Sequence, residues 1–100
     1  MALTDAQKEA IYRIRRNRPA SAGFFDHLAK LQNNMKKASV SVVEQHSGMN
    51  RKLSLQLMNE IAETGVASVR GGGGGEESYL AWGDDIDCRE IGRNTDTPLR

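Results

Sequence analysis

The stretch from Val42 to Val66, VVEQHSGMNRKLSLQLMNEIAETGV, predicts a short helix, a tight turn and a longer helix. Gly48 suits the turn because glycine adopts a positive φ without the Cβ clash that other residues suffer. Asn50 suits the first cap of the longer helix, since its side-chain oxygen can accept a bond from a backbone N–H one turn on. Gly65 is expected to end that helix. Its apolar residues recur at helical spacing, namely Leu53, Leu57, Met58 and Ile61.

A β-branched, alternating segment follows at Val66–Arg70, Ser78–Trp82 matches it, and the two segments predict a hairpin. The loop between them holds five consecutive glycines, 71–75, followed by Glu76 and Glu77. No Gly-Lys-Ser/Thr follows these glycines, so they do not form a Walker loop. A mobile hairpin tip is a better interpretation than a dedicated anion cradle.

These features resemble the winged helix-turn-helix superfamily of prokaryotic DNA-binding regulators over roughly residues 20–82. The resemblance rests on three short runs: Gly48-Met49-Asn50-Arg51, Leu57-Met58-x-x-Ile61 and Glu63-Thr64-Gly65-Val66. It implies that the helix at 50–64 enters the major groove and that the hairpin is a wing. Two positions depart from the pattern: Glu44 replaces a small residue between the helices, and Ser54 replaces a β-branched apolar core residue.

At 100° per residue, the core face of the helix at 50–64 is expected to hold Leu53, Leu57, Ile61 and, at its edge, Met58. The opposite face should hold Lys52, Leu55, Gln56, Asn59 and Glu63, with Arg51 at the border. Arg and Lys can donate to guanine O6 and N7, Gln and Asn can pair with adenine, and leucine can touch a thymine methyl. The predicted base contacts are therefore Asn50, Arg51, Lys52, Leu55, Gln56 and Asn59. The alternative is a solvated polar face.

Three helices are expected before the turn, of which the third is the short helix already described. The first covers residues 4–18, with Thr4 as its cap. Its narrow apolar stripe indicates either a dimerisation surface or an ordinary flanking helix, and the stripe residues are Leu3, Ile11 and Ile14. The second covers 24–37 and supplies most of the core, through Phe24 or Phe25, Leu28, Leu31 and Met35. The third runs to His46 and is capped by Ser39 or Ser41.

Charge is unevenly distributed along the chain. Residues 1–37 hold eight Lys/Arg against three Asp/Glu, whereas residues 71–100 hold three against seven, within an overall net charge of +1. A basic front suggests contact with a polyanion, although a bipolar solvated surface is the alternative. The predicted phosphate contacts are Arg70, Lys36, Lys37, Arg15 and Arg16.

Several classes of protein are disfavoured. The 100 residues support one small domain, no apolar run reaches the length of a membrane span, and the start MALTDAQKE does not resemble a signal peptide. Cys88 is the one cysteine and predicts neither a disulfide nor a metal site, and His46 is expected to be a plain surface residue. The acids Asp84, Asp85 and Asp87 lack a nearby histidine. We therefore expect no enzyme, no metal, no cofactor and a cytoplasmic location.

The sequence thus predicts a mainly α fold with a small β-hairpin, a winged helix-turn-helix with an extra N-terminal helix. We expect an N-terminal helix at 1–19, the winged domain at 20–82 and a disordered acidic tail at 83–100 that could recruit a protein partner. The expected function is binding of double-stranded DNA by a homodimer, as a small transcriptional regulator or partition-type DNA binder. The alternative is a winged-helix module for protein–protein contacts, without sequence-specific DNA binding.

Overall fold

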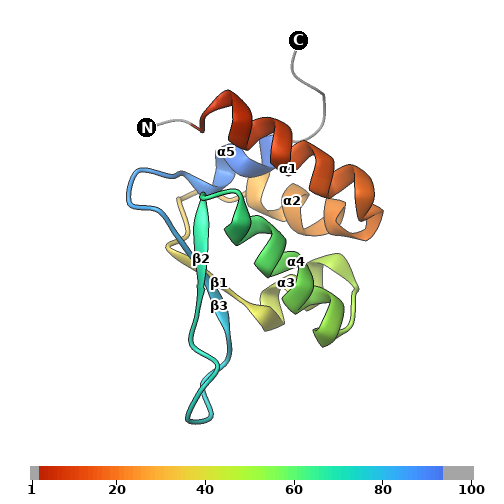
Figure 1. Ribbon diagram of the computed structural model, residues 1–100, viewed down its shortest axis with the longest axis vertical. Coiled ribbons are helices and arrows are strands. Elements are labelled where there is room, and N and C mark those ends of the chain that lie inside the picture. The colour runs from red at the N-terminus through yellow and green to blue at the C-terminus, as the bar shows by residue number, and fades with distance from the viewer. Residues whose placement is uncertain (1–2, 94–100) are drawn as a thin grey trace.

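The computed structural model describes residues 3–93, which form five α-helices and a three-stranded antiparallel sheet (Figure 1). The first helix, α1, spans Asp5–Asn17. It begins at a capping box, in which the Thr4 side chain accepts from the Gln7 N–H at 3.1 Å and the Gln7 side chain accepts from the Thr4 N–H at 3.0 Å. This confirms the predicted first helix and its cap. A single 3₁₀ turn, η1, follows at Pro19–Ser21.

The second helix is much shorter than the sequence suggested. α2 spans Ala22–Ala29, and the prediction that it continues to residue 37 is wrong. Asn33 and Asn34 follow Gln32, and asparagine is unfavourable within a helix because its side chain can bond backbone groups in other conformations. Asn34 does so at both ends of its amide, donating to the Ile86 carbonyl at 3.2 Å and accepting from the Cys88 N–H at 3.0 Å. The chain then enters a short strand, β1, at Lys37–Ser39.

The two helices at the centre of the chain form as predicted. α3 spans Val40–Ser47 and is capped by Ser39, and α4 spans Arg51–Glu63 and is capped by Asn50, whose side chain accepts from the Leu53 N–H. Between them Gly48 has φ 75°, the left-handed conformation that a tight turn requires. Gly65, with φ 89°, follows the end of α4 as expected.

The buried face of α4 is rotated from the predicted one. Ser54, Leu57, Met58 and Ile61 are buried, whereas Leu53 is 36% exposed. On a helix of 3.6 residues per turn, a step of four residues rotates the side chain by about 40° beyond one full turn. Leu53 therefore lies to one side of the face that Leu57 and Ile61 define. Ser54 takes the inward position instead, and its hydroxyl donates to the Met49 carbonyl at 3.4 Å.

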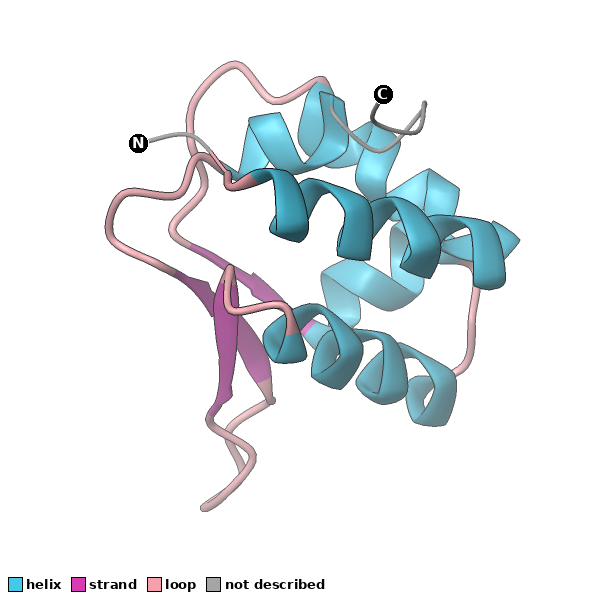
Figure 2. Cartoon of the chain, turned by 45° about the horizontal axis from the view of Figure 1, so that its top comes forward, coloured by secondary structure: helices cyan, strands magenta, loops and turns pink. Residues whose placement is uncertain are grey.

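The predicted hairpin is present and carries a third strand. β2 spans Ala67–Arg70 and β3 spans Tyr79–Trp82, and β1 pairs with the other side of β3, giving the order β1-β3-β2. Leu80 of β3 pairs on one side with Ala38 of β1 and on the other side with Val69 of β2. The glycine loop extends beyond the sheet, away from the helices (Figures 1 and 2).

The segment after the sheet is folded, so the prediction of a disordered tail from residue 83 is wrong where the structure describes it. α5 spans Cys88–Arg93 and packs against α2, and it buries Cys88 and Ile91. Asp87 begins this helix by accepting from the Arg89 N–H at 2.9 Å, and the Arg89 guanidinium lowers the pKa of Asp87 to about 2. The remainder of the predicted tail, 94–100, lies outside the described residues.

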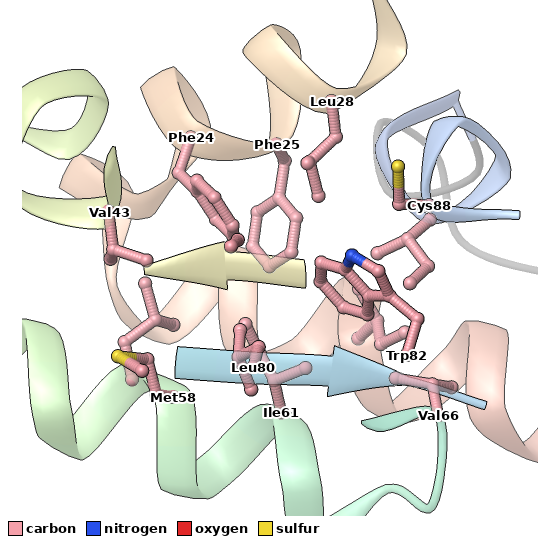
Figure 3. Close-up of a cluster of buried hydrophobic side chains, with 14 of the residues drawn as sticks. Phe24, Phe25, Leu28, Val43, Met58, Ile61, Val66, Leu80, Trp82 and Cys88 are labelled. Carbon is pink, nitrogen blue, oxygen red and sulfur yellow. The ribbon is translucent and has the colours of Figure 1, made fainter. Parts of the chain in front are cut away.

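The core lies between α2, the sheet and α4. Figure 3 shows Phe24, Phe25 and Leu28 pointing from α2 toward β3, while Met58 and Ile61 approach from α4. Leu3 and Ile11 also belong to this core, at 6% and 0% exposure, and Ile14 packs against it. Leu3 and Ile11 are therefore covered within one chain, which favours an ordinary flanking helix over a dimerisation surface, whereas Ile14 is only partly buried.

No helix among residues 3–93 combines the length and the apolar character needed to cross a membrane.

Candidate nucleic-acid interface

The outward face of α4 carries the polar side chains that the sequence placed there. Lys52, Gln56, Asn59 and Glu63 are all exposed. Leu55 is only partly buried but packs against the core, so it is not the freely exposed side chain that was expected. Asn50 lies at the start of the helix, and its side-chain oxygen is occupied by the cap, accepting from the Leu53 N–H at 2.9 Å.

Arg51 is held by two carboxylates from different elements. Its Nη2 lies 2.9 Å from a carboxylate oxygen of Glu44 on α3 and 3.2 Å from one of Glu77, which precedes β3. The same Glu77 oxygen accepts a hydrogen bond from Ser41 Oγ. Glu77 therefore ties the loop end of the hairpin to both α3 and α4. These contacts raise the pKa of Arg51, chiefly through the hydrogen bond to Glu44.

Arg18 also reaches the outward face of α4, although it is not among the contacts predicted from the sequence. Its guanidinium donates to both carboxylate oxygens of Glu60, at 2.9 and 2.8 Å, and to Gln56 Oε1 at 3.3 Å. The hydrogen bond to Glu60 raises the pKa of Arg18. α1 and α4 border a common groove, lined by Ala10, Arg13, Ile14, Asn17, Glu60, Glu63 and Thr64. The end of α1 therefore contributes to this surface.

The predicted phosphate contacts fall into separate groups. On the sheet, Lys37 Nζ lies 4.6 Å from the centre of the Tyr79 ring, and Arg70 is the cross-strand neighbour of Tyr79. Lys36 is exposed just before β1. These three cations thus lie on or beside the sheet. On α1, Arg15 bonds Asp26 of α2 at 3.2 Å, and Arg16 lies 5.7 Å from the Tyr12 ring.

His46 has a specific neighbour, which corrects its interpretation as a plain surface residue. Its ring stacks on that of His27, with centroids 3.6 Å apart and planes at 9°. Helices α2 and α3 approach each other closely at this point, since a Cβ on Gly23 would lie 2.1 Å from the His46 carbonyl oxygen. Burial, and then the positive charge that His46 can carry, lower the pKa of His27.

Among residues 3–93 there is no group of three or more His, Cys, Asp or Glu side chains arranged to hold a metal ion. Cys88 is a free, buried thiol whose Sγ accepts from the Met35 N–H at 3.4 Å, and burial raises its pKa. It thus has the character of a core residue.

The comparisons with known proteins place no constraint on this site. No family model matches the chain, and no curated protein or solved structure gives a significant match.

Proposed function

We propose that the chain is a winged helix-turn-helix protein that binds duplex DNA, with α4 as the element that enters the major groove. The observation that carries this proposal is the outward face of α4, where Lys52, Gln56 and Asn59 are exposed side by side at helical spacing. The order of elements supports it: helix, strand, two helices joined by a tight turn, and a hairpin. The most suitable role is that of a small prokaryotic transcriptional regulator or partition-type DNA binder, acting in the cytoplasm.

In the proposed complex the first three turns of α4 read base edges, and cations beside them contact phosphate. Lys52 can donate to guanine, and the Gln56 and Asn59 amides can pair with base edges. The cations on and beside the sheet, Lys36, Lys37 and Arg70, fix the register on the backbone without reading sequence. Pairing of two chains on a palindromic site remains part of the proposal, through a surface other than the buried stripe of α1.

Selection from a random duplex pool, followed by a salt series, tests this proposal. We expect one enriched sequence, an affinity that falls steeply with salt, and loss of enrichment in Lys52→Ala and Gln56→Ala. Lys30→Ala is the matched control, because Lys30 is exposed at the end of α2 and should leave the enriched sequence unchanged. Absence of binding at low salt would refute the proposal.

A second expected result concerns Glu77. Because its carboxylate competes with DNA for Arg51, Glu77→Gln should tighten DNA binding by up to about five-fold, which is the range of an exposed ion pair. The slope of log affinity against log salt concentration should also become steeper, by about the amount that one additional phosphate contact contributes. Binding of a fluorescent duplex, measured by anisotropy at several salt concentrations, gives both quantities.

The control for this result is Glu76→Gln, which makes the same charge change one residue earlier in the same exposed loop. The contacts of Arg51 go to Glu44 and Glu77. If Glu76→Gln and Glu77→Gln tighten DNA binding equally, the change in net charge explains the effect, and Glu77 does not compete with DNA for Arg51.

The second candidate function is a module for protein contacts. It is favoured by Leu53, a large apolar side chain that is 36% exposed on α4, and by the carboxylates of Glu60 and Glu63 on the same helix. Under this function Leu53→Asp abolishes partner binding, whereas Lys52→Ala and Gln56→Ala do not. The DNA selection separates the two functions, since only the first yields an enriched sequence.

A further inference from the structure

Arg18 contacts the outward face of α4 through three side-chain hydrogen bonds, and it comes from a distant part of the sequence. Nε and Nη2 each bond a different oxygen of Glu60, and Nη2 also donates to Gln56 Oε1. Gln56 and Glu60 are four residues apart, so they lie on the same side of the helix. The Arg18 side chain is 23% exposed, which places it at the border of the proposed DNA-binding face.

The backbone of Arg18 is fixed on both sides. Its N–H donates to the Ile14 carbonyl at 2.9 Å, which ends α1. Its carbonyl accepts from the backbone N–H of Ser21 at 2.9 Å and from the Ser21 hydroxyl at 2.7 Å, and Ser21 is fully buried. The next residue is Pro19, whose ring fixes φ. The guanidinium is therefore presented to α4 from a rigid corner of the chain.

This contact determines how the Gln56 amide faces outward. A guanidinium has donors and no acceptor, so the amide must turn its oxygen toward Arg18 and its NH₂ group away. An amide that pairs with adenine uses both groups at once, accepting from N6 and donating to N7. With its oxygen directed at a cation, Gln56 offers mainly a donor. Because the Glu60 carboxylate balances the charge of the guanidinium, the preference for the O6 and N7 acceptors of guanine rests on the orientation of the amide, which presents its donor to the groove.

We propose that Arg18 is a positioning residue that fixes the Gln56 amide and thereby makes this position of α4 select guanine over adenine. The proposal rests on the proposed function, because it assumes that α4 lies in a major groove. Without this contact a glutamine at position 56 would be expected to pair with adenine, so the preference for guanine depends on Arg18.

The test is a set of selections from the random duplex pool with four proteins: the natural chain, Arg18→Met, Gln56→Ala and the double variant. We expect the natural chain to prefer guanine at one position by about five- to ten-fold, the contribution of one hydrogen bond to a charged or polar partner. Gln56→Ala should lose the preference at that position. Arg18→Met should lose it or replace it with adenine, and the double variant should match Gln56→Ala.

A direct phosphate contact by Arg18 predicts a different result. Arg18→Met would then weaken binding to all sequences, lower the salt slope by about one contact and keep the guanine preference, and this outcome would overturn the proposal. Arg13→Met is the matched control, because it removes the same charge from the same helix and the Arg13 guanidinium is paired with Glu9 of α1 at 3.4 Å, so its loss should leave the base preference unchanged. If Arg18→Met does not fold, Arg18→Lys serves, since lysine keeps the charge but lacks the fork that holds Glu60 and Gln56 together.

Failure of the natural chain to bind any duplex at low salt would overturn the proposed function, and the inference with it. Binding with an enriched sequence that shows adenine at the position lost in Gln56→Ala would leave the proposed function intact and overturn only the role of Arg18.

Discussion

Replacing Ile11 with alanine is expected to lower the free energy of unfolding by about 2–5 kcal/mol, by the same amount at every protein concentration. Ile11 is fully buried within a single chain, in the same cluster as the side chains of α2 and α4. The loss therefore comes from a cavity in the core of one chain, which the surroundings can only partly fill. Urea denaturation at two protein concentrations at least ten-fold apart measures both the loss and its independence of concentration.

Leu53→Ala is the control for this result, because it shortens a large apolar side chain that is 36% exposed. Its effect should stay below about 1 kcal/mol. A destabilisation by Ile11→Ala that grows on dilution, accompanied by a change in oligomeric state, would instead place Ile11 in an interface between chains and return the α1 stripe to a dimerisation role.

Gly92→Ala is expected to destabilise the protein by about 3 kcal/mol, although alanine is normally the better helix former by about 1 kcal/mol. A Cβ at this position would lie 2.2 Å from the Phe25 carbonyl oxygen and 2.5 Å from the Ala29 backbone nitrogen. Both atoms belong to the backbone of α2, so α5 would have to move away from α2 to make room. Thermal and urea denaturation give the sign and the size of the change.

Gly73→Ala provides the comparison, since it adds the same methyl group in the hairpin loop where no atom lies within 4 Å. It should change stability by less than about 0.5 kcal/mol. If Gly92→Ala stabilises the protein, as helix propensity alone predicts, then α5 does not pack against α2 in solution.

Local signals account for the parts of the fold that could be predicted. Caps and turns depend on a few neighbouring residues, so Thr4, Gly48 and Asn50 indicated the correct helix boundaries. The hairpin strands were recognisable for the same reason, through their alternation. The error on α4 came from ranking residues by hydrophobicity, because the packing of α4 buries the small Ser54 and leaves Leu53 exposed.

The elements that were missed depend on partners far away in the sequence. β1 has only three residues and pairs with β3 about forty residues later. α5 has six residues, and its burial depends on Gly92 meeting α2. Neither carries a periodic pattern long enough to read. For the candidate site, the exposed polar residues of α4 could be predicted. The partners of Arg51, Gln56 and His46 could not, because tertiary packing brings each residue to a partner that is distant in the sequence.

The position of β1 has a consequence for the order in which the chain folds. Pairing of Lys37–Ser39 with Tyr79–Ala81 closes a loop that contains α3, α4 and β2. Closing about forty residues costs roughly 3 kcal/mol of chain entropy, whereas the α3–α4 turn and the β2–β3 hairpin need only short closures. We expect these local units to form early and the β1 contacts late, so that substitutions in β1 accelerate unfolding more than they slow folding.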